Sequence, residues 1–218
     1  KAEDGIRDPL WSRGLGDVYK RQIHILTPRN MTQAAGFYNT LLQLDQPAIV
    51  IECLNGYRIK EQLPKNLGEF TVPIGKVEFM CTGNDITVVS YGSTLRIVQS
   101  ASKKLLNEGI SVEVIDVQSL IPFDLHNEIS KSISKTNRLL IVDEDVPGGA
   151  SSYILQQLIE NQKIFNLLDS SPKLLSAKSH RPAYGGDGDY LSKPSEDDIF
   201  EAVYEIMNDS NPKDFPIL

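Results

Sequence analysis

The sequence predicts an α/β protein whose open, mainly parallel β-sheet carries helices on both faces. Two observations support this fold class. Short apolar runs typical of buried strands alternate with amphipathic segments long enough to form helices. Glycine, proline and asparagine residues separate these runs, as expected where a strand turns into a helix.

The regular pattern begins with a β-α-β unit. Residues 23–26 form the first expected strand, and Asn30 or Thr32 is expected to cap the helix that follows. Residues 48–51, with the sequence AIVI, form the second expected strand. Because this run is apolar at every position, it predicts a strand that is covered on both faces.

A second unit follows a long connection at residues 52–74, which is interrupted by glycine and proline. Strands are expected at residues 77–80 and 86–89, with a turn at Gly83-Asn84 between them. Further along the chain we expect a helix at 93–107, a strand at 112–115, a helix bearing Ile129 and Ile133, a strand at 138–142, a helix at 150–160, a short strand at 174–175, and a helix that begins at Ser195. The last helix has the strongest start signal, because a hydroxyl cap is followed by three acidic residues.

Residues 1–22 differ from the rest of the chain. Charges, glycines and a proline are scattered there without the period of a helix or a strand. We interpret this segment as non-native or disordered sequence, and the alternative is a genuine solvent-exposed arm.

Composition excludes several classes of function. The net charge is −7, which disfavours nucleic acid as a partner because such binding needs clustered lysine and arginine. No apolar run approaches the roughly 20 residues that a membrane span requires. The two cysteines are far apart and favour a reducing compartment. We therefore expect a cytoplasmic protein that binds neither nucleic acid nor membrane.

Two loops are candidates for chemistry. In residues 143–149, three acidic residues follow a strand and a glycine pair then opens a helix. The carboxylates would repel a phosphate, so this loop suits a subunit contact or a cation, and equally a plain helix cap. His180-Arg181 could contact an anionic substrate or a partner carboxylate, although a solvated loop is the simpler interpretation. No serine, histidine and aspartate group stands out for nucleophilic catalysis.

The order of segments resembles the β chains of 2-oxo acid dehydrogenases, which depend on thiamine diphosphate. The resemblance is carried by residues 25–28 with their helix, 48–58, 70–76, 85–92, 114–124 and 135–138. It implies the end of a pyrimidine-binding α/β domain at 23–60, a linker with a first strand at 61–84, a transketolase-type C-terminal domain at 85–208 and a tail at 209–218. The 143–149 loop and the HRPAYG segment most resemble single-chain forms, in which the α and β regions are fused.

The resemblance implies a reaction and a set of partners. Such enzymes decarboxylate a 2-oxo acid, of the pyruvate or the branched-chain type, on thiamine diphosphate held with Mg²⁺. They then transfer the acyl group to the lipoyl arm of an acyltransferase component. The expected partners are therefore the α region, that acyltransferase and further subunits of a homo- or hetero-oligomer.

No catalytic or cofactor-binding residue is assigned to this chain. The glutamate and histidine of the family's active site precede the part represented here, and the Mg²⁺ motif belongs to the α region. The segment Gly185-Gly186-Asp187-Gly188-Asp189 has the letters of that motif, but no apolar strand leads into it. We interpret it as a tight surface loop, and we expect the chain alone to be inactive.

Two sites are implied by the resemblance. Backbone carbonyls of related β chains hold a structural potassium ion, and their counterparts here are Leu41, Leu42, Leu44 and Gln46. The C-terminal domain of such chains docks a small basic domain of the acyltransferase. The candidate contacts are Asp209, Asp214 and Leu218, and the alternative is a frayed acidic tail.

Two other functions stay open. The chain could be a non-catalytic assembly or docking module. It could also be a fragment like transketolase or 1-deoxyxylulose-5-phosphate synthase, which share the C-terminal architecture. Residues 56–58 and 70–76 favour the dehydrogenase.

Overall fold

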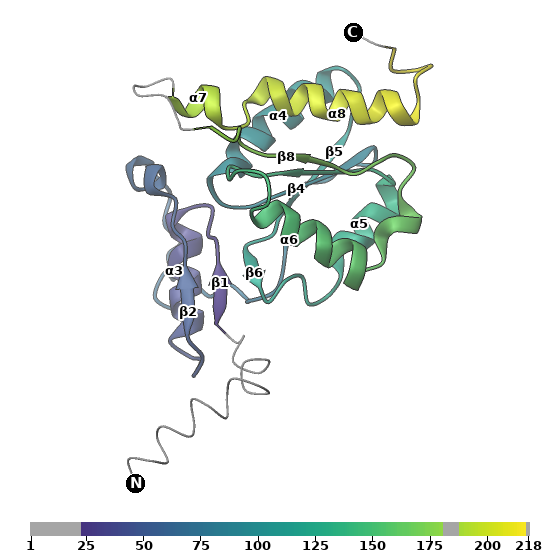
Figure 1. The fold of residues 1–218 in the computed structure, drawn as a ribbon. Helices are drawn as coiled ribbons and strands as arrows, with labels where there is room; N and C mark the ends of the chain where they lie inside the picture. The colour runs from purple at the N-terminus through teal and green to yellow at the C-terminus, as the bar shows by residue number, and fades with distance from the viewer. Residues whose placement is uncertain (1–22, 181–187, 217–218) are drawn as a thin grey trace.

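The computed structural model describes residues 23–180 and 188–216 and contains two β-sheets (Figure 1). The smaller sheet has the strand order β2-β1-β6, and the larger has the order β3-β5-β4-β7-β8. The strands are β1 (His24–Leu26), β2 (Ala48–Val50), β3 (Glu78–Cys81), β4 (Ile86–Ser90), β5 (Val112–Asp116), β6 (Ser119–Ile121), β7 (Leu139–Val142) and β8 (Lys173–Leu175). The helices are α3 (Met31–Leu41), α4 (Leu95–Asn107), α5 (Glu128–Thr136), α6 (Ala150–Gln156), α7 (Gly188–Ser192) and α8 (Glu196–Ser210).

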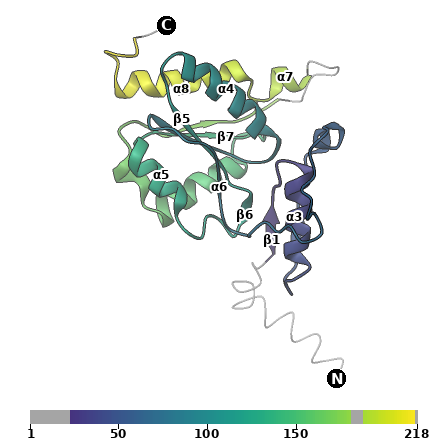
Figure 2. The same cartoon turned by 180° about the vertical axis from the view of Figure 1, so that it is seen from behind.

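The larger sheet confirms the predicted fold class. Strands β5, β4, β7 and β8 run parallel, and only the edge strand β3 is antiparallel. Helices α4 and α8 cover one face, and α5 and α6 cover the other (Figures 1 and 2). No helix in the described part of the chain is long and apolar enough to cross a membrane.

The two faces of the sheet have separate cores because side chains alternate along each strand. Val88 of β4 packs on the side of α4 and α8, whereas its neighbour Val89 packs on the side of α5 and α6. The central strands are buried at every position, which explains why their sequences read as continuous apolar runs.

The turn expected between β3 and β4 does not join a hairpin. β3 pairs antiparallel with β5, and β4 lies on the other side of β5. Gly83 passes so close to β5 that an added Cβ would lie 2.2 Å from the carbonyl carbon of Val112. The strand that the sequence grouped with the linker is therefore the edge of the larger sheet.

The first module, residues 23–74, forms the expected β-α-β unit. β1 and β2 run parallel, and the Asn30 side chain accepts a hydrogen bond from the Gln33 amide at the start of α3. The expectation that residues 48–51 are covered on both faces was wrong. Val50 packs with Phe37 of α3, whereas Ile49 and Ile51, on the opposite face of β2, are 51% and 52% exposed.

Strand β6, which the sequence did not predict, joins the two sheets. It follows β5 directly and pairs antiparallel with β1 of the first module. A chain segment from the larger domain thereby completes the small sheet, and this places the first module beside the carboxyl ends of the large parallel sheet (Figure 1).

Candidate functional site at the carboxyl edge of the sheet

The carboxyl ends of β4 and β7 mark the point at which ligands are expected to bind. From β4 the chain passes through α4 to β5 on one side, and β7 lies on the other side of β4. Such a change of direction leaves a crevice between two neighbouring strands, outside their carboxyl ends. The segments that meet here are Tyr91 to Thr94 after β4 and Asp143 to Glu144 after β7.

Asp143 holds this edge together. Its side chain is fully buried and accepts hydrogen bonds from the Tyr91 hydroxyl at 2.5 Å and from the amides of Asp145 and Ser151 at 3.0 and 2.8 Å. Burial, together with the bond to Asp143, raises the pKa of Tyr91 well above its usual value. The carboxylate therefore anchors the start of α6 and the loop, and all its partners belong to the protein itself.

The 143–149 loop presents two further acidic side chains. Asp145 is exposed, and its carboxylate accepts the Val146 amide within the loop at 2.8 Å. Glu144 instead accepts hydrogen bonds from the Ser93 hydroxyl at 3.0 Å and from Lys193 at 3.2 Å.

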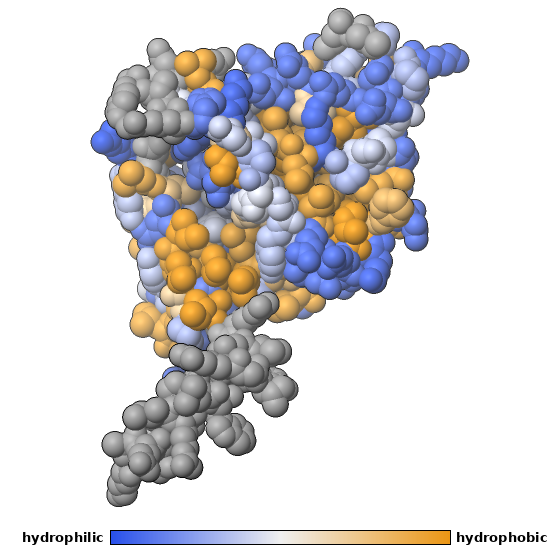
Figure 3. Space-filling view, viewed as in Figure 1, coloured by the Kyte–Doolittle hydropathy of each residue, from blue (hydrophilic) through white to orange (hydrophobic). Residues whose placement is uncertain are grey.

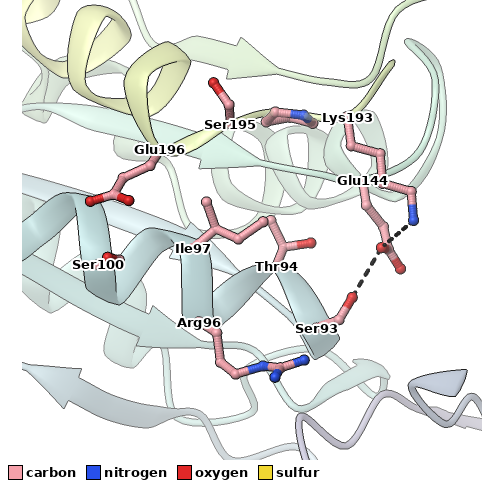
Figure 4. A pocket seen from close by; sticks show the side chains of 10 residues that line it. Ser93, Thr94, Arg96, Ile97, Ser100, Glu144, Lys193, Ser195 and Glu196 are labelled. Atoms are coloured by element: carbon pink, nitrogen blue, oxygen red, sulfur yellow. Dashed lines mark hydrogen bonds and ion pairs between the residues drawn. The ribbon is translucent and has the colours of Figure 1, made fainter. Parts of the chain in front are cut away.

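A cavity of about 490 Å³ opens at this edge, between the first turns of α4 and α8 (Figure 4). Thr94, Arg96 and Ile97 line it from the α4 side, and Lys193 and Pro194 line it from the segment before α8. Glu144, bonded to Ser93 and Lys193, lies at one end. The volume lies within the range of about 300–1,000 Å³ that small-molecule sites occupy.

A polar cluster fixes the first module against the large sheet. Arg29 donates to Asp116, at the end of β5, over 2.7 Å and to Glu78 of β3 over 2.7 and 2.9 Å. Gln33 donates to Asp116 and, over a very short contact, to Gln118. Gln118 has a φ of +59°, and this turn aims its carbonyl at the Thr27 amide, 2.8 Å away.

Burial controls the charge of this cluster. Asp116 is fully buried, and desolvation raises its pKa to about 6 although Arg29, Gln33 and the Gln118 amide favour the carboxylate. For Arg29 the balance is reversed: burial would lower its pKa, but the hydrogen bonds to Glu78 and Asp116 raise it. At neutral pH the two groups therefore form an ion pair that bridges the modules.

Cys53 lies in the connection after β2, close to the same edge. It is half-buried, its thiol donates to the Pro28 carbonyl at 3.4 Å, and it is not in a disulfide. Burial raises its pKa, and the nearby Glu144 adds to the effect. The group is therefore a thiol at neutral pH, which makes it a weak nucleophile.

The residues expected to bind potassium lie at the turn between α3 and β2. The Leu41 carbonyl accepts the Leu44 amide at 3.0 Å, and Leu42 is largely exposed. The Gln46 side chain bonds to His24 across the turn at 2.6 Å. This loop lies on the first module, away from the cavity.

The residues expected to dock a partner lie at the opposite end of α8 from the cavity. Asp209 and Asp214 are exposed, and Asp214 accepts a hydrogen bond from Asn211 at 2.7 Å. The chain after α8 folds back, because Phe215 packs edge-on against Tyr204 and its carbonyl accepts from Asn208. Leu218 lies outside the described residues, as do Arg181, the Gly185–Asp187 part of the tight loop and residues 1–22.

Among residues 23–180 and 188–216, no group of three histidine, cysteine, aspartate or glutamate side chains could hold a metal ion. Sequence reasoning located the 143–149 loop but missed the Arg29 cluster and the cavity. Both are assembled from segments far apart in the chain, and no local pattern reports such a contact.

Comparisons with known proteins are consistent with this architecture. Residues 75–185 match the family described as "Transketolase, C-terminal domain". The chain is 35% identical over 181 residues to the pyruvate dehydrogenase E1 component subunit beta of Mesostigma viride, covering 83% of this chain and 53% of that protein. It is 30% identical over 187 residues to the acetoin:2,6-dichlorophenolindophenol oxidoreductase subunit beta of Bacillus subtilis, covering 84% of this chain and 53% of that one.

The fold is shared with solved structures of lower identity. A split-gene transketolase, described as an inactive beta4 tetramer, superposes with a TM-score of 0.68 at 19% identity. That match covers 87% of this chain and 59% of the other. The chain therefore spans about half the length of the curated relatives that it matches.

Proposed function

This chain belongs to the transketolase C-terminal domain family, and from that premise we propose that it is the C-terminal part of the β region of a 2-oxo acid dehydrogenase component. One observation carries the proposal. The identity to the pyruvate dehydrogenase β subunit extends over 181 residues, and so reaches well beyond the 75–185 segment that defines the family. It therefore includes residues of the first module. The split-gene transketolase covers a similar share of the chain, but at 19% identity against 35%, and this difference favours a dehydrogenase.

The proposed division of the chain follows the two sheets. Residues 23–60 are the end of a pyrimidine-binding domain, 61–84 connect it to the next domain and supply β3, 85–208 form the C-terminal domain, and 209–218 form the tail. The Arg29 cluster and β6 fix the first two of these parts to the third. The chain's own contribution is thus to hold the end of one domain rigidly against another.

Thiamine diphosphate would supply the carbon chemistry of the complete enzyme, in which a 2-oxo acid loses carbon dioxide. The resemblance places the Mg²⁺ motif in the α region, and on that ground we assign the cofactor and its metal ion to the α region and to the remainder of the β region. The substrate, pyruvate or a branched 2-oxo acid, is selected there as well.

Two partner sites belong to the same proposal. The turn with Leu41, Leu42, Leu44 and Gln46 would hold a potassium ion through its backbone carbonyls. Asp209 and Asp214, exposed at the end of α8, would attract the basic domain of a lipoyl acyltransferase together with Leu218. Replacing potassium with choline should lower the melting temperature if the turn holds the ion.

A calorimetric titration of the purified 218-residue chain with thiamine diphosphate and Mg²⁺ tests the main proposal. We expect no saturable heat, and no turnover of pyruvate or 3-methyl-2-oxobutanoate with an artificial electron acceptor. Addition of an α region and the missing β residues should restore both signals. Saturable binding to the chain alone would contradict the assignment.

A second candidate function is an assembly module without catalysis. The exposed apolar face of β2 favours it, since such a surface on an edge strand invites a partner. Failure of the added α and β segments to restore turnover, although they bind the chain, would favour this alternative.

A further inference from the structure

We propose that the cavity between α4 and α8 is a binding site for a small organic anion, which presents a carboxylate or a phosphate monoester to α4 and an apolar body to Ile97 and Pro194. This site is separate from the decarboxylation proposed above and does not depend on it. Four features of the cavity support the inference.

The first feature is its position. The cavity lies beyond the carboxyl ends of β4 and β7, where the strand order of the sheet changes direction. In open α/β sheets this crevice collects ligands because helix amino termini and loop side chains converge on it. Ser93 and Thr94 lie in the turn after β4, and Glu144 lies in the loop after β7.

The second feature is Thr94, whose hydroxyl makes no hydrogen bond within the part of the chain that the structure describes. Thr94 is only 4% exposed and lines the cavity. It precedes α4 but makes no capping hydrogen bond, and its hydroxyl bonds to none of the residues that the structure describes. Figure 4 shows the hydroxyl directed across the cavity, toward the side of Glu144 and Lys193. The hydroxyl oxygen itself reaches the open space of the cavity, since it is not one of the solvent-inaccessible side-chain atoms that lack a partner among the described residues. A ligand oxygen would there take the place of water as its hydrogen-bond partner.

The third feature is the contrast between the two helix ends that meet at the cavity. The amino-terminal end of α8 is already capped and neutralised by the protein, since Ser195 and Asp198 form a capping box and the first turn holds three acidic residues. The 13-residue α4 has no acidic residue in its first turn and no side-chain cap. A 3-10 turn, Gly92–Thr94, leads directly into α4, and the Leu95 amide already donates to the Ser93 carbonyl. What favours an anion here is therefore the positive dipole end of this turn and helix, which no acidic side chain of the first turn of α4 neutralises.

The fourth feature is the balance of charge on the cavity wall. Glu144 is paired with Lys193, and Glu196 is paired with Lys104. Arg96 is exposed and has no ion pair or hydrogen bond to any described residue. In Figure 4 its side chain leaves α4 on the side opposite Ile97, and the guanidinium lies near the Ser93 end of the helix. One positive charge thus remains for a ligand, and it has the fork geometry that suits a carboxylate or a phosphate.

The apolar part of the ligand is inferred from the opposite wall. Ile97 and Pro194 face the cavity with side chains that offer no hydrogen bond. A free inorganic ion would leave this wall in contact with water, whereas a ring or an aliphatic chain would cover it. The volume of about 490 Å³ has room for such a body beside the charged group.

The experiment compares three probes that share one ring: phenyl phosphate, benzoate and the neutral benzyl alcohol. Each is titrated into the isotopically labelled 218-residue chain, and amide shifts are followed by NMR. We expect the two anions to shift the amides of residues 93–97 saturably and benzyl alcohol to leave them unchanged. Tighter binding of phenyl phosphate would identify a phosphate ligand, and tighter binding of benzoate would identify a carboxylate.

Variants of two residues test the contacts. Thr94→Val keeps the shape of the side chain but removes the hydroxyl, and Arg96→Gln removes the charge. Each should weaken the preferred anion by about tenfold, as expected for a hydrogen bond to a charged group. Thr94→Ser restores the hydroxyl and should restore the affinity. The matched control is Lys103→Gln, which removes an exposed charge from the far end of α4 and should have no effect.

Several outcomes would overturn the inference. The first is the absence of any saturable shift with millimolar anion. The second is an equal response to benzyl alcohol, which would show an apolar crevice without anion recognition. Unchanged affinity in both Thr94→Val and Arg96→Gln, with undisturbed spectra elsewhere, would place the anion at another site.

Discussion

At the scale of single residues, Asp116 is a buried acid whose protonation depends on its surroundings. Its carboxyl group is fully buried at the junction of the two modules, and burial raises its pKa from 3.8 to about 6. The folded state therefore binds this proton more tightly than the unfolded chain does. The resulting stabilisation is complete below the unfolded pKa of 3.8 and is lost as the pH rises through about 6.

This linkage predicts the pH dependence of stability. Relative to Asp116→Asn, the unfolding free energy of the natural chain should fall by roughly 3 kcal/mol between these two pKa values, at 1.36 kcal/mol for each pKa unit. Urea unfolding at a series of pH values measures the difference. Glu52 and Asp198, whose pKa values are lowered, act in the opposite direction and at lower pH. A difference that is flat from pH 4 to 7 would show that Asp116 titrates normally.

Gly83 makes a second residue-scale prediction. A methyl group here would lie 2.2 Å from the backbone of β5, so Gly83→Ala forces β5 and the preceding chain apart. We expect a loss of about 2 kcal/mol or more in unfolding free energy, the usual cost of overpacking. Gly68→Ala is the control, because no atom lies within 4 Å of its added Cβ. Equal stability of the two variants would contradict the close approach.

At the scale of elements, the start of α8 is where local sequence and structure agree best. The acidic run after Ser195 predicted a capped helix, and the structure confirms both bonds of the capping box with Asp198. Ser195→Ala should therefore lower the unfolding free energy by about 1 kcal/mol. Chemical denaturation measures this loss, and Ser195→Asp should retain most of the stability because aspartate also caps. A loss equal to that of Ser195→Ala would argue against capping.

Other elements show why sequence alone did not suffice. The central strands and the helices between them were predicted, because burial on both faces leaves a continuous apolar run and a covered helix leaves a periodic one. β6 was missed because Ser119–Ile121 is a strand only through its pairing with β1, almost a hundred residues away. The exposure of β2 was missed for the complementary reason: its sequence is apolar although nothing described covers its outer side.

In the candidate site, too, features with a local sequence signal were predicted, and features that depend on distant contacts were not. The 143–149 loop was found because an acidic run followed by two glycines is a local signal. The different environments of its acidic residues depend on partners elsewhere in the chain: Asp143 is buried against Tyr91 and α6, and half-buried Glu144 accepts from Ser93. Thr94 carries no signal in the sequence at all, since an unused hydroxyl looks like any other helix cap.

At the scale of the whole molecule, the first module is stabilised by very little core of its own. Its buried cluster consists of Leu26, Phe37 and Val72, whereas each face of the large sheet buries twelve or more apolar residues. The apolar side chains over β2 and its neighbouring turn remain exposed, and Figure 3 shows them gathered on one side of the molecule. Stability there depends on the Arg29 cluster, on β6 and on whatever covers β2.

This imbalance predicts that the isolated chain self-associates through β2. An edge strand with free backbone groups and exposed isoleucines is the surface on which chains pair. Replacing both Ile49 and Ile51 with lysine adds charge to that edge and should weaken the association constant at least tenfold, since burying one isoleucine contributes about 1.5–3 kcal/mol. Light scattering over a range of chain concentrations measures the change.

Leu106→Lys is the control, because Leu106 is equally exposed but lies on α4, far from the small sheet. If the chain is monomeric at all concentrations, or if Leu106→Lys weakens association as much as the double variant, the association does not involve β2. If the double variant alone is monomeric, β2 is the surface on which the remainder of a longer β region would pack.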